Sequence, residues 1–193
     1  MAYPVTAGRG LFARGATFFR CAALLGLAGL ALAGCTSDKQ KGLCPSAFAI
    51  TPVSNLTVFR QNAPQDPSGE LYTVSIADVK TNCKFDKKEI TTDSEIGVVF
   101  RAKRAAATDG GTYNVPYFLA VTRHGDKILT KKLFIAHVAF APGQTSVSFE
   151  DKIDSTTINI ARNAKVGEYA IMVGFQLTKE QLDYNTKMNR YAP

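Results

Sequence analysis

The sequence contains no tryptophan and only two histidines among its 193 residues. Nucleophilic catalysis needs a base beside a serine, cysteine or threonine, and histidine is the commonest such base. His124 stands beside Gly125 in a predicted turn, where an exposed polar side chain is ordinary. His137 lies in a strand-like segment, where we expect a half-exposed or hydrogen-bonded structural role. No Gly-x-Ser-x-Gly nucleophile motif is present. These shortages favour a protein that is not an enzyme.

Acidic residues are also poorly placed for chemistry. A pair of carboxylates could cleave glycosidic bonds, but Glu150 and Asp151 are adjacent and would point to opposite faces of a strand. Asp93 and Glu95 could share a face, yet we interpret the segment 91–95 as a solvated polar turn. The segment 109–111, Asp-Gly-Gly, lacks the series of acidic ligands that a calcium loop needs. We therefore expect no metal and no cofactor.

The chain has one long uncharged apolar segment, residues 21–32, and no second run long enough to span a membrane. It follows a basic stretch without acidic residues and precedes Ala33 and Gly34, two small residues. A basic start, an apolar centre and small residues before a cleavage point are the three parts of a secretory signal. A transmembrane anchor is the alternative, but this run is shorter than the roughly 20 residues that span a bilayer.

The four residues Leu32-Ala33-Gly34-Cys35 resemble the lipobox of a bacterial lipoprotein signal peptide. The resemblance implies cleavage before Cys35 and lipid on both its thiol and its new amino group. Lipoproteins of this kind carry three acyl chains, and two or more chains hold a protein stably on a membrane. Thr36, rather than aspartate, follows the cysteine. By resemblance to Gram-negative lipoproteins this implies the outer membrane with the body in the periplasm; the inner membrane and the cell surface stay open.

Removal of residues 1–34 changes the charge of the chain. The 23 basic residues fall to 20 against 16 acidic ones, so the formal charge falls from +7 to about +4. A nucleic-acid role thereby loses its main support, and we expect no nucleic-acid partner. The remaining 159 residues suffice for one domain with its own core. We divide the chain into a signal peptide (1–34), a lipidated tether (35–42) and a single domain (43–193).

Four cysteines occur in the chain, and two of them remain for the domain. Cys21 leaves with the signal and Cys35 carries the lipid. An even pair in an exported protein indicates a disulfide, here between Cys44 and Cys83. Closing this loop would stabilise the fold by about 3–4 kcal/mol on the chain-entropy model. A metal site or a catalytic thiol is the alternative, but the spacing fits no ligand pattern that we recognise.

Beyond residue 43, apolar and polar residues alternate over segments separated by turn signals. Gly125 can adopt positive φ, so the segment 113–140 is predicted to be a hairpin. Thr178 and Gln181 resemble a capping box that starts a short helix at 181–187. The other predicted strands are 56–60, 71–85 with a bulge near 77–79, 96–104, 146–151, 158–160 and 169–177. These elements predict an all-β fold, an antiparallel β-sandwich with an immunoglobulin-like or fibronectin-III-like topology and a short C-terminal helix.

Basic residues gather at several places in the predicted sheets. Alternation puts Val98, Phe100 and Ala102 on the core face of one strand and Arg101 and Lys103 together on its other face. Other lysines decorate the predicted hairpin. Such groups could contact anionic headgroups, phosphate-bearing glycans or an acidic protein. We favour the alternative that they are solvated and protect strand edges from aggregation.

Function is the least constrained conclusion from the sequence. We expect a membrane-anchored, non-enzymatic binding or structural module of the cell envelope, with a protein partner of unknown identity. An exposed strand edge would let that partner add a strand, and the hairpin 113–140 is the predicted contact. A carrier of a lipid or another apolar ligand is the alternative, and a cell-wall hydrolase is a weaker one.

Overall fold

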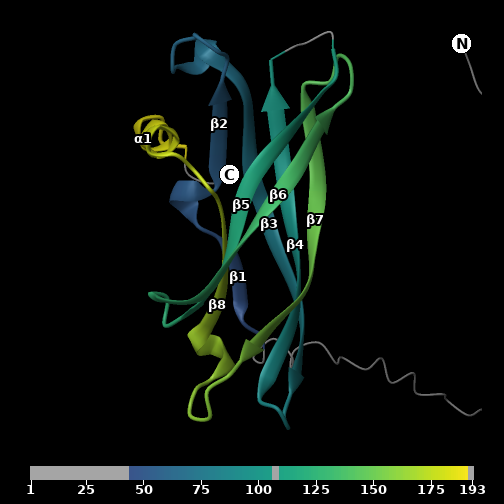
Figure 1. Ribbon diagram of the computed structural model, residues 1–193, viewed down its shortest axis with the longest axis vertical. Helices are drawn as coiled ribbons and strands as arrows, with labels where there is room; N and C mark the ends of the chain where they lie inside the picture. The colour runs from purple at the N-terminus through teal and green to yellow at the C-terminus, as the bar shows by residue number, and fades with distance from the viewer. Residues whose placement is uncertain (1–43, 106–108, 191–193) are drawn as a thin grey trace, which may run out of the picture. The chain divides into compact units, whose positions relative to one another are not determined.

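The structure is a computed structural model, and it describes residues 44–105 and 109–190 (Figure 1). These residues belong to one of the two units into which the chain divides, Cys35–Pro193. They form eight strands, three single-turn 3-10 helices and one α-helix. The strands are β1 (Ser46–Ala49), β2 (Asn55–Phe59), β3 (Glu70–Asp86), β4 (Thr91–Arg104), β5 (Gly111–Arg123), β6 (Lys127–Phe140), β7 (Ser146–Asn159) and β8 (Tyr169–Phe175), and the helix is α1 (Lys179–Lys187). The 3-10 helices are Thr51–Val53, Pro67–Gly69 and Val166–Glu168.

Two four-stranded sheets make a β-sandwich, which confirms the predicted fold class. We call β1-β8-β5-β6 the first sheet and β2-β3-β4-β7 the second sheet. Five of the six strand pairs are antiparallel, and β1 alone pairs in parallel, with β8. Strands β3 to β8 neighbour one another as strands A, B, C, C′, E and F do in immunoglobulin domains. Strand β1 takes the place beside β8 where strand G would lie.

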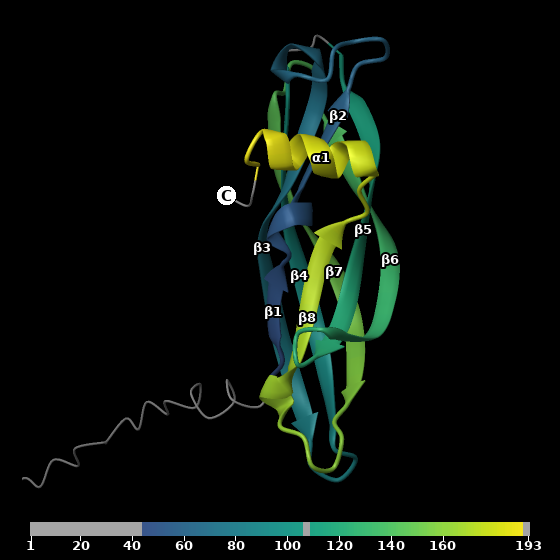
Figure 2. The same cartoon turned by 90° about the vertical axis from the view of Figure 1, so that its left-hand side faces the viewer.

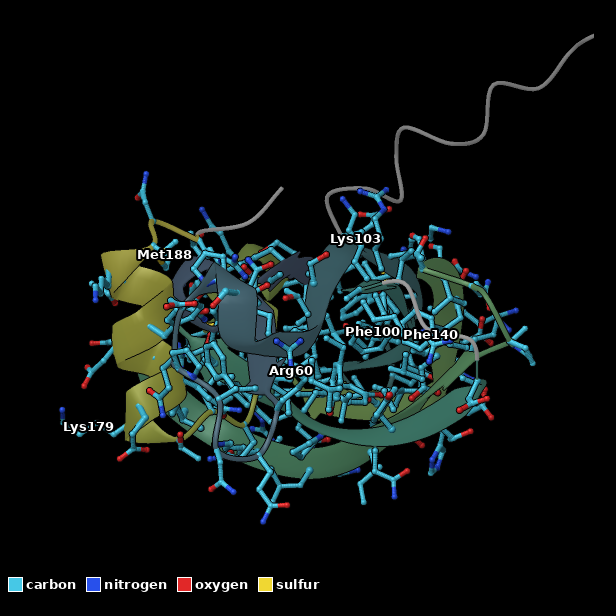
Figure 3. All side chains as sticks on the ribbon, turned by 90° about the horizontal axis from the view of Figure 1, so that it is seen from above. Arg60, Phe100, Lys103, Phe140, Lys179 and Met188 are labelled. Atoms are coloured by element: carbon cyan, nitrogen blue, oxygen red, sulfur yellow. A yellow bond between two sulfur atoms is a disulfide. The ribbon has the colours of Figure 1, made fainter. Side chains whose placement is uncertain are left out.

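The core consists of the inward-facing rows of both sheets, as the alternation predicts. Val98, Phe100 and Ala102 on β4 are fully buried. The Phe100 ring lies 5.2 Å from the rings of both Tyr117 on β5 and Phe149 on β7, measured between centroids. Such aromatic pairs add stability beyond the area that they bury. Seen along the strands, Phe100 and Phe140 lie between the two layers, whereas Lys103 projects outward (Figure 3).

The predicted hairpin is confirmed as β5 and β6. The turn between them uses His124 at φ 56° and Gly125 at φ 82°, so two successive residues have positive φ. The register pairs Arg123 with Lys127, so the loop has three residues, and Gly125 adopts its positive φ at no steric cost. The predicted bulge in β3 is also confirmed, because its register with β4 shifts between Ile76 and Asp78.

Two sequence predictions about the strands were wrong, and one strand was missed. The segment 91–95 is not a turn but the start of β4, where Thr92 and Ser94 point inward and are fully buried. Small hydroxyl side chains therefore continue the core row at this end of the sandwich, and their polarity hides the alternation. The segments 146–151 and 158–160 are not two strands, because one strand, β7, runs from Ser146 through the first and ends at Asn159 within the second. Strand β1 was not predicted.

A disulfide holds the first described residue against β3, and the C-terminal helix packs against β2. Cys44 and Cys83 are bonded, with their Cα atoms 5.8 Å apart, which confirms the predicted pair. Thr178 caps α1 through the predicted box: its hydroxyl accepts from the Gln181 amide at 3.3 Å. The helix starts at Lys179, two residues earlier than predicted, and lies across the strands beside β2 (Figure 2). The Asn185 side chain there donates to the Asn55 carbonyl at 2.7 Å.

Candidate functional site

The residues singled out from the sequence divide into those that the structure describes and those that it does not. Cys35 and the whole segment 1–42 lie outside the described residues, so the lipidation site stays a prediction. Cys44 and Cys83 are described, and their disulfide leaves neither sulfur as a thiol nucleophile or a thiolate ligand. No helix within 44–105 and 109–190 is long and apolar enough to cross a membrane.

The two histidines lie in the elements that we predicted, His124 in the hairpin turn and His137 in a strand. His137 is exposed on β6, and its Nδ1 lies 2.8 Å from the Asn114 Oδ1 on the paired strand. The Nε2 of His124 lies in the hairpin turn, 3.4 Å from a Glu168 carboxylate oxygen. Glu168 also accepts from Arg123 at 2.9 Å. The histidines thus belong to separate polar contacts at opposite ends of β6.

The acidic residues are likewise held in separate contacts. Asp93 accepts from the hydroxyl of Thr157 on β7, and Glu150 pairs with Lys80 at 3.2 Å. Asp151 accepts from the Tyr117 hydroxyl at 2.9 Å. Burial of Tyr117 raises the pKa of its hydroxyl, and the bond to Asp151 raises it further. Within the described part of the chain, no group of three histidine, cysteine or acidic side chains is arranged to hold a metal ion.

The most unusual surface of the described residues is the open edge of β6. This 14-residue strand pairs with β5 on one side, and no described strand pairs with its other side. Ile128, Leu133 and Ile135 are 62%, 66% and 55% exposed. Large aliphatic side chains beside unpaired backbone groups are what most proteins avoid at a sheet edge, because such an edge accepts a foreign strand.

The apolar character of this edge continues across the outer face of the first sheet. Register places Leu133 beside Phe118 and Ile135 beside Pro116, both on β5. On β8, a Cβ added to Gly174 would meet the Phe118 ring at 3.0 Å, so the glycine lets that ring lie against the strand. Phe48 on β1 is 43% exposed at the opposite edge of the same sheet. We call Phe48, Pro116, Phe118, Leu133 and Ile135 the apolar face.

Positive charge borders the apolar face. Lys131 extends over the Phe118 ring, with its Nζ 4.2 Å from the ring centroid, and also donates to Gln176 at 3.1 Å. Lys127 and Lys132 are exposed on the same strand. The acidic residue nearest to β6 in the sequence is Asp126, which directly precedes the strand in the turn. The edge of β6 therefore combines aliphatic side chains with lysines.

The sequence located this surface only in part. It predicted the hairpin as a contact, but it did not identify Leu133 and Ile135 as exposed. Both belong to the nearly continuous apolar run 133–140, in which inward and outward residues are equally apolar. The loss of alternation itself indicated an unusual outer face. A strand that is buried on one face normally has polar residues on its solvated face.

Comparisons with known proteins give no relative for this chain. No protein-family model, no curated protein and no solved structure matches it.

Proposed function

We propose that this protein is a non-enzymatic binding module of the bacterial envelope, held on the membrane by lipid at Cys35, that captures an extended segment of a partner protein along β6. The single observation that supports this proposal most is the open β6 edge with Leu133 and Ile135 exposed beside it. A strand added there would gain backbone hydrogen bonds along the edge and bury these side chains, which is the basis of β-augmentation.

Charge indicates the chemistry of the partner. Lys127, Lys131 and Lys132 lie along the edge, and β6 itself contains no acidic residue. Pairing β6 with β6 of a second copy would bring two positively charged edges together, and like charges across a strand pair destabilise it. The occupant that fits is an extended segment of a different protein, with apolar residues alternating with acidic ones.

The interior of the sandwich gives less support to an apolar carrier. Such a carrier needs a cavity between its sheets, whereas here Phe100, Tyr117 and Phe175 fill that space as fully buried side chains. Interiors packed in this way leave no room for a lipid chain. The proposal of a protein-binding edge accounts for the exposed aliphatic residues, which a carrier does not require.

Site-specific photo-crosslinking in the native cells tests the proposal. The photoreactive amino acid p-benzoylphenylalanine would replace Ile135 on β6 or, as the matched control, Ser148 on the open edge strand β7. We expect the Ile135 position to crosslink one envelope protein through an acidic, extended peptide identified by mass spectrometry. A Leu133→Lys change in the same chain should abolish that adduct. Equal crosslinking from Ser148, or adducts only with a second copy of this chain, would contradict the proposal.

A further inference from the structure

A groove lies on the outer face of the second sheet, whereas the β6 edge belongs to the first sheet. It has a volume of about 610 Å³ and lies where β2, β3 and β4 run side by side near the end of α1. Figure 3 shows Lys103 projecting from this sheet on the side away from Phe100 and the core. We call it the basic groove and define it by six of the residues that line it: Asn55, Thr73, Ser75, Arg101, Lys103 and Arg190.

Strand register explains why these polar side chains meet. Thr73 is the partner of Lys103, and Ser75 is the partner of Arg101. Asn55 on β2 is in turn opposite Ser75. Side chains of paired residues point to the same face of a sheet, so hydroxyl, amide and cationic groups from three strands share one surface.

Arg190 reaches the groove from far along the chain. Its carbonyl accepts from the Asn55 side chain at 3.3 Å, which holds the segment after α1 against β2. Its guanidinium donates to the Thr57 hydroxyl at 3.1 Å and lies 2.6 Å from a Glu70 oxygen. Glu70 thus offsets one cation of the groove.

The other cations that line the groove differ in whether they have partners within the protein. Arg104 donates to the carbonyls of Gln144 and Asp109, both at 2.8 Å. Arg101 and Lys103 are exposed and make no ion pair with any described residue. They are two residues apart on one face of β4, about 7 Å along the strand. Their mutual repulsion would be relieved by an anion bound between them.

We propose that the basic groove binds the phosphate group of an anionic ligand. A guanidinium such as that of Arg101 can donate two parallel hydrogen bonds to phosphate oxygens, and Lys103 supplies a compact point charge. The hydroxyls of Thr73 and Ser75 beside them already donate to Glu70 and to the Arg101 carbonyl, both at 3.3 Å, so the two cations supply the hydrogen bonds to the ligand. A phosphate presents several acceptor oxygens in different directions, so it can accept from Arg101 and Lys103 at the same time. This inference depends on neither the β6 edge nor the lipid at Cys35.

Inorganic phosphate is the first probe. The full chain would be titrated with it in detergent while backbone amide resonances are followed by NMR. We expect saturable shifts at Thr73, Ser75, Arg101 and Lys103. The double change Arg101→Ala with Lys103→Ala should weaken binding roughly tenfold or more, because it removes charge-assisted bonds. Both side chains are exposed, so this variant should keep its melting temperature.

The control variant carries Lys84→Ala with Lys87→Ala, which removes the same charge from exposed positions outside the groove. It should bind phosphate within about twofold of the parent, since only screened, long-range attraction is lost. Equal weakening in both variants, or no saturable shift in the groove, would overturn the proposal.

A second pair of titrations distinguishes the source of the phosphate. Both use a Cys35→Ser background, so that no lipid at that position contributes to membrane binding. Sedimentation with phosphatidylcholine vesicles that contain phosphatidic acid, lost in the double variant, would identify a lipid headgroup. Binding of glucosamine 1-phosphate but not of these vesicles would identify a soluble or glycan-borne phosphate. Binding of neither would overturn the proposal.

Discussion

The two edge strands β6 and β7 differ in the side chains that they present to solvent. Each has 14 residues and lies at the open edge of a sheet, and a single loop joins them. Leu133 and Ile135 point outward from β6, whereas Ser148, Glu150 and Lys152 occupy the outward row of β7. One edge presents aliphatic side chains, and the other presents polar and charged ones.

The difference shows which edge is protected. On β7, the register with β4 shifts between Ser94 and Ile96, and Ser155 adopts φ 47°. A bulge with charged neighbours twists an edge away from foreign strands. The irregularity in the β5–β6 pair lies beside the turn, between Val121 and Thr122, and leaves the stretch around Leu133 regular. Strand β7 therefore has the features that protect an edge against pairing, and the stretch of β6 around Leu133 lacks them.

The largest predicted effect removes the core that both edges share. Phe100→Ala should lower the free energy of unfolding by about 3–5 kcal/mol, because a fully buried aromatic ring is replaced by a cavity. Denaturant unfolding would measure this. Any loss of partner binding should follow the unfolded fraction, and it should disappear at temperatures where the variant is folded. A binding defect in the fully folded variant would show that the β6 edge is not an independent site.

Removing the disulfide should act on stability alone. The paired change Cys44→Ser with Cys83→Ser should cost about 2–4 kcal/mol, since the unfolded chain regains the freedom of a loop closed across 39 residues. Thermal unfolding with and without reductant measures it, and reductant should no longer affect the variant. Crosslinking from Ile135 in the folded variant should be unchanged; its loss would connect the two regions in a way that the structure does not explain.

Charge placed on each edge in turn tests the comparison directly. Leu133→Lys should weaken partner binding by about tenfold to a hundredfold, as loss of a central apolar contact does. Ser148→Lys on β7 should leave it within about twofold. Both side chains point outward, and Ser148→Lys loses one hydrogen bond, from the Ser148 hydroxyl to the Phe100 carbonyl at 3.1 Å. Both variants should therefore keep the parent's stability to about 1 kcal/mol. Equal effects of the two changes on affinity would refute the assignment of β6.

The reverse exchange makes β7 resemble β6. Ser148→Leu with Glu150→Ile should promote self-association of the chain, because it replaces two polar residues on an open edge with aliphatic ones. Analytical ultracentrifugation would detect it as a rise in average mass with concentration. The matched control, Ser148→Thr with Glu150→Gln, should sediment as the parent does.

The smallest predicted effect concerns pH at the hairpin turn. A backbone hydrogen bond from Lys165 and the contact with Arg123 lower the pKa of Glu168 below its ordinary 4.5. A carboxyl whose pKa is lowered by folding stabilises the fold above its unfolded pKa, and the contribution disappears as pH falls through the lowered value. Glu168→Gln should therefore reduce stability slightly at pH 6 and not at pH 3. Urea unfolding at both pH values measures this, and an equal loss at pH 3 would contradict the role of the charge.

Much of the fold was predictable because its signals are local. Val98, Phe100 and Ala102 alternate with Arg101 and Lys103, so the two faces of β4 could be predicted from period two alone. The β5–β6 turn was predictable from Gly125. The β1 strand was not, because its four residues are stabilised by pairing with β8, and Ser46 lies opposite Ala170. No local pattern encodes a contact between residues so far apart.

The candidate sites likewise combine features that local sequence predicts with features that depend on the whole fold. The pairing of Arg101 with Lys103 on one face was predictable, but the arrival of Arg190 beside them depends on how α1 packs against β2. The exposure of Leu133 and Ile135 depends on which strand ends the sheet, and strand order is a property of the whole fold.

Amide hydrogen exchange on the crosslinked complex tests the central claim most directly. The complex formed through Ile135 would be purified with the uncomplexed chain as reference, and exchange would be compared peptide by peptide. We predict that amides around Leu133 on β6 become strongly protected while those of β7 keep their rates, because a partner strand would pair with β6 alone. Unchanged exchange on β6, or new protection on β7, would contradict the account.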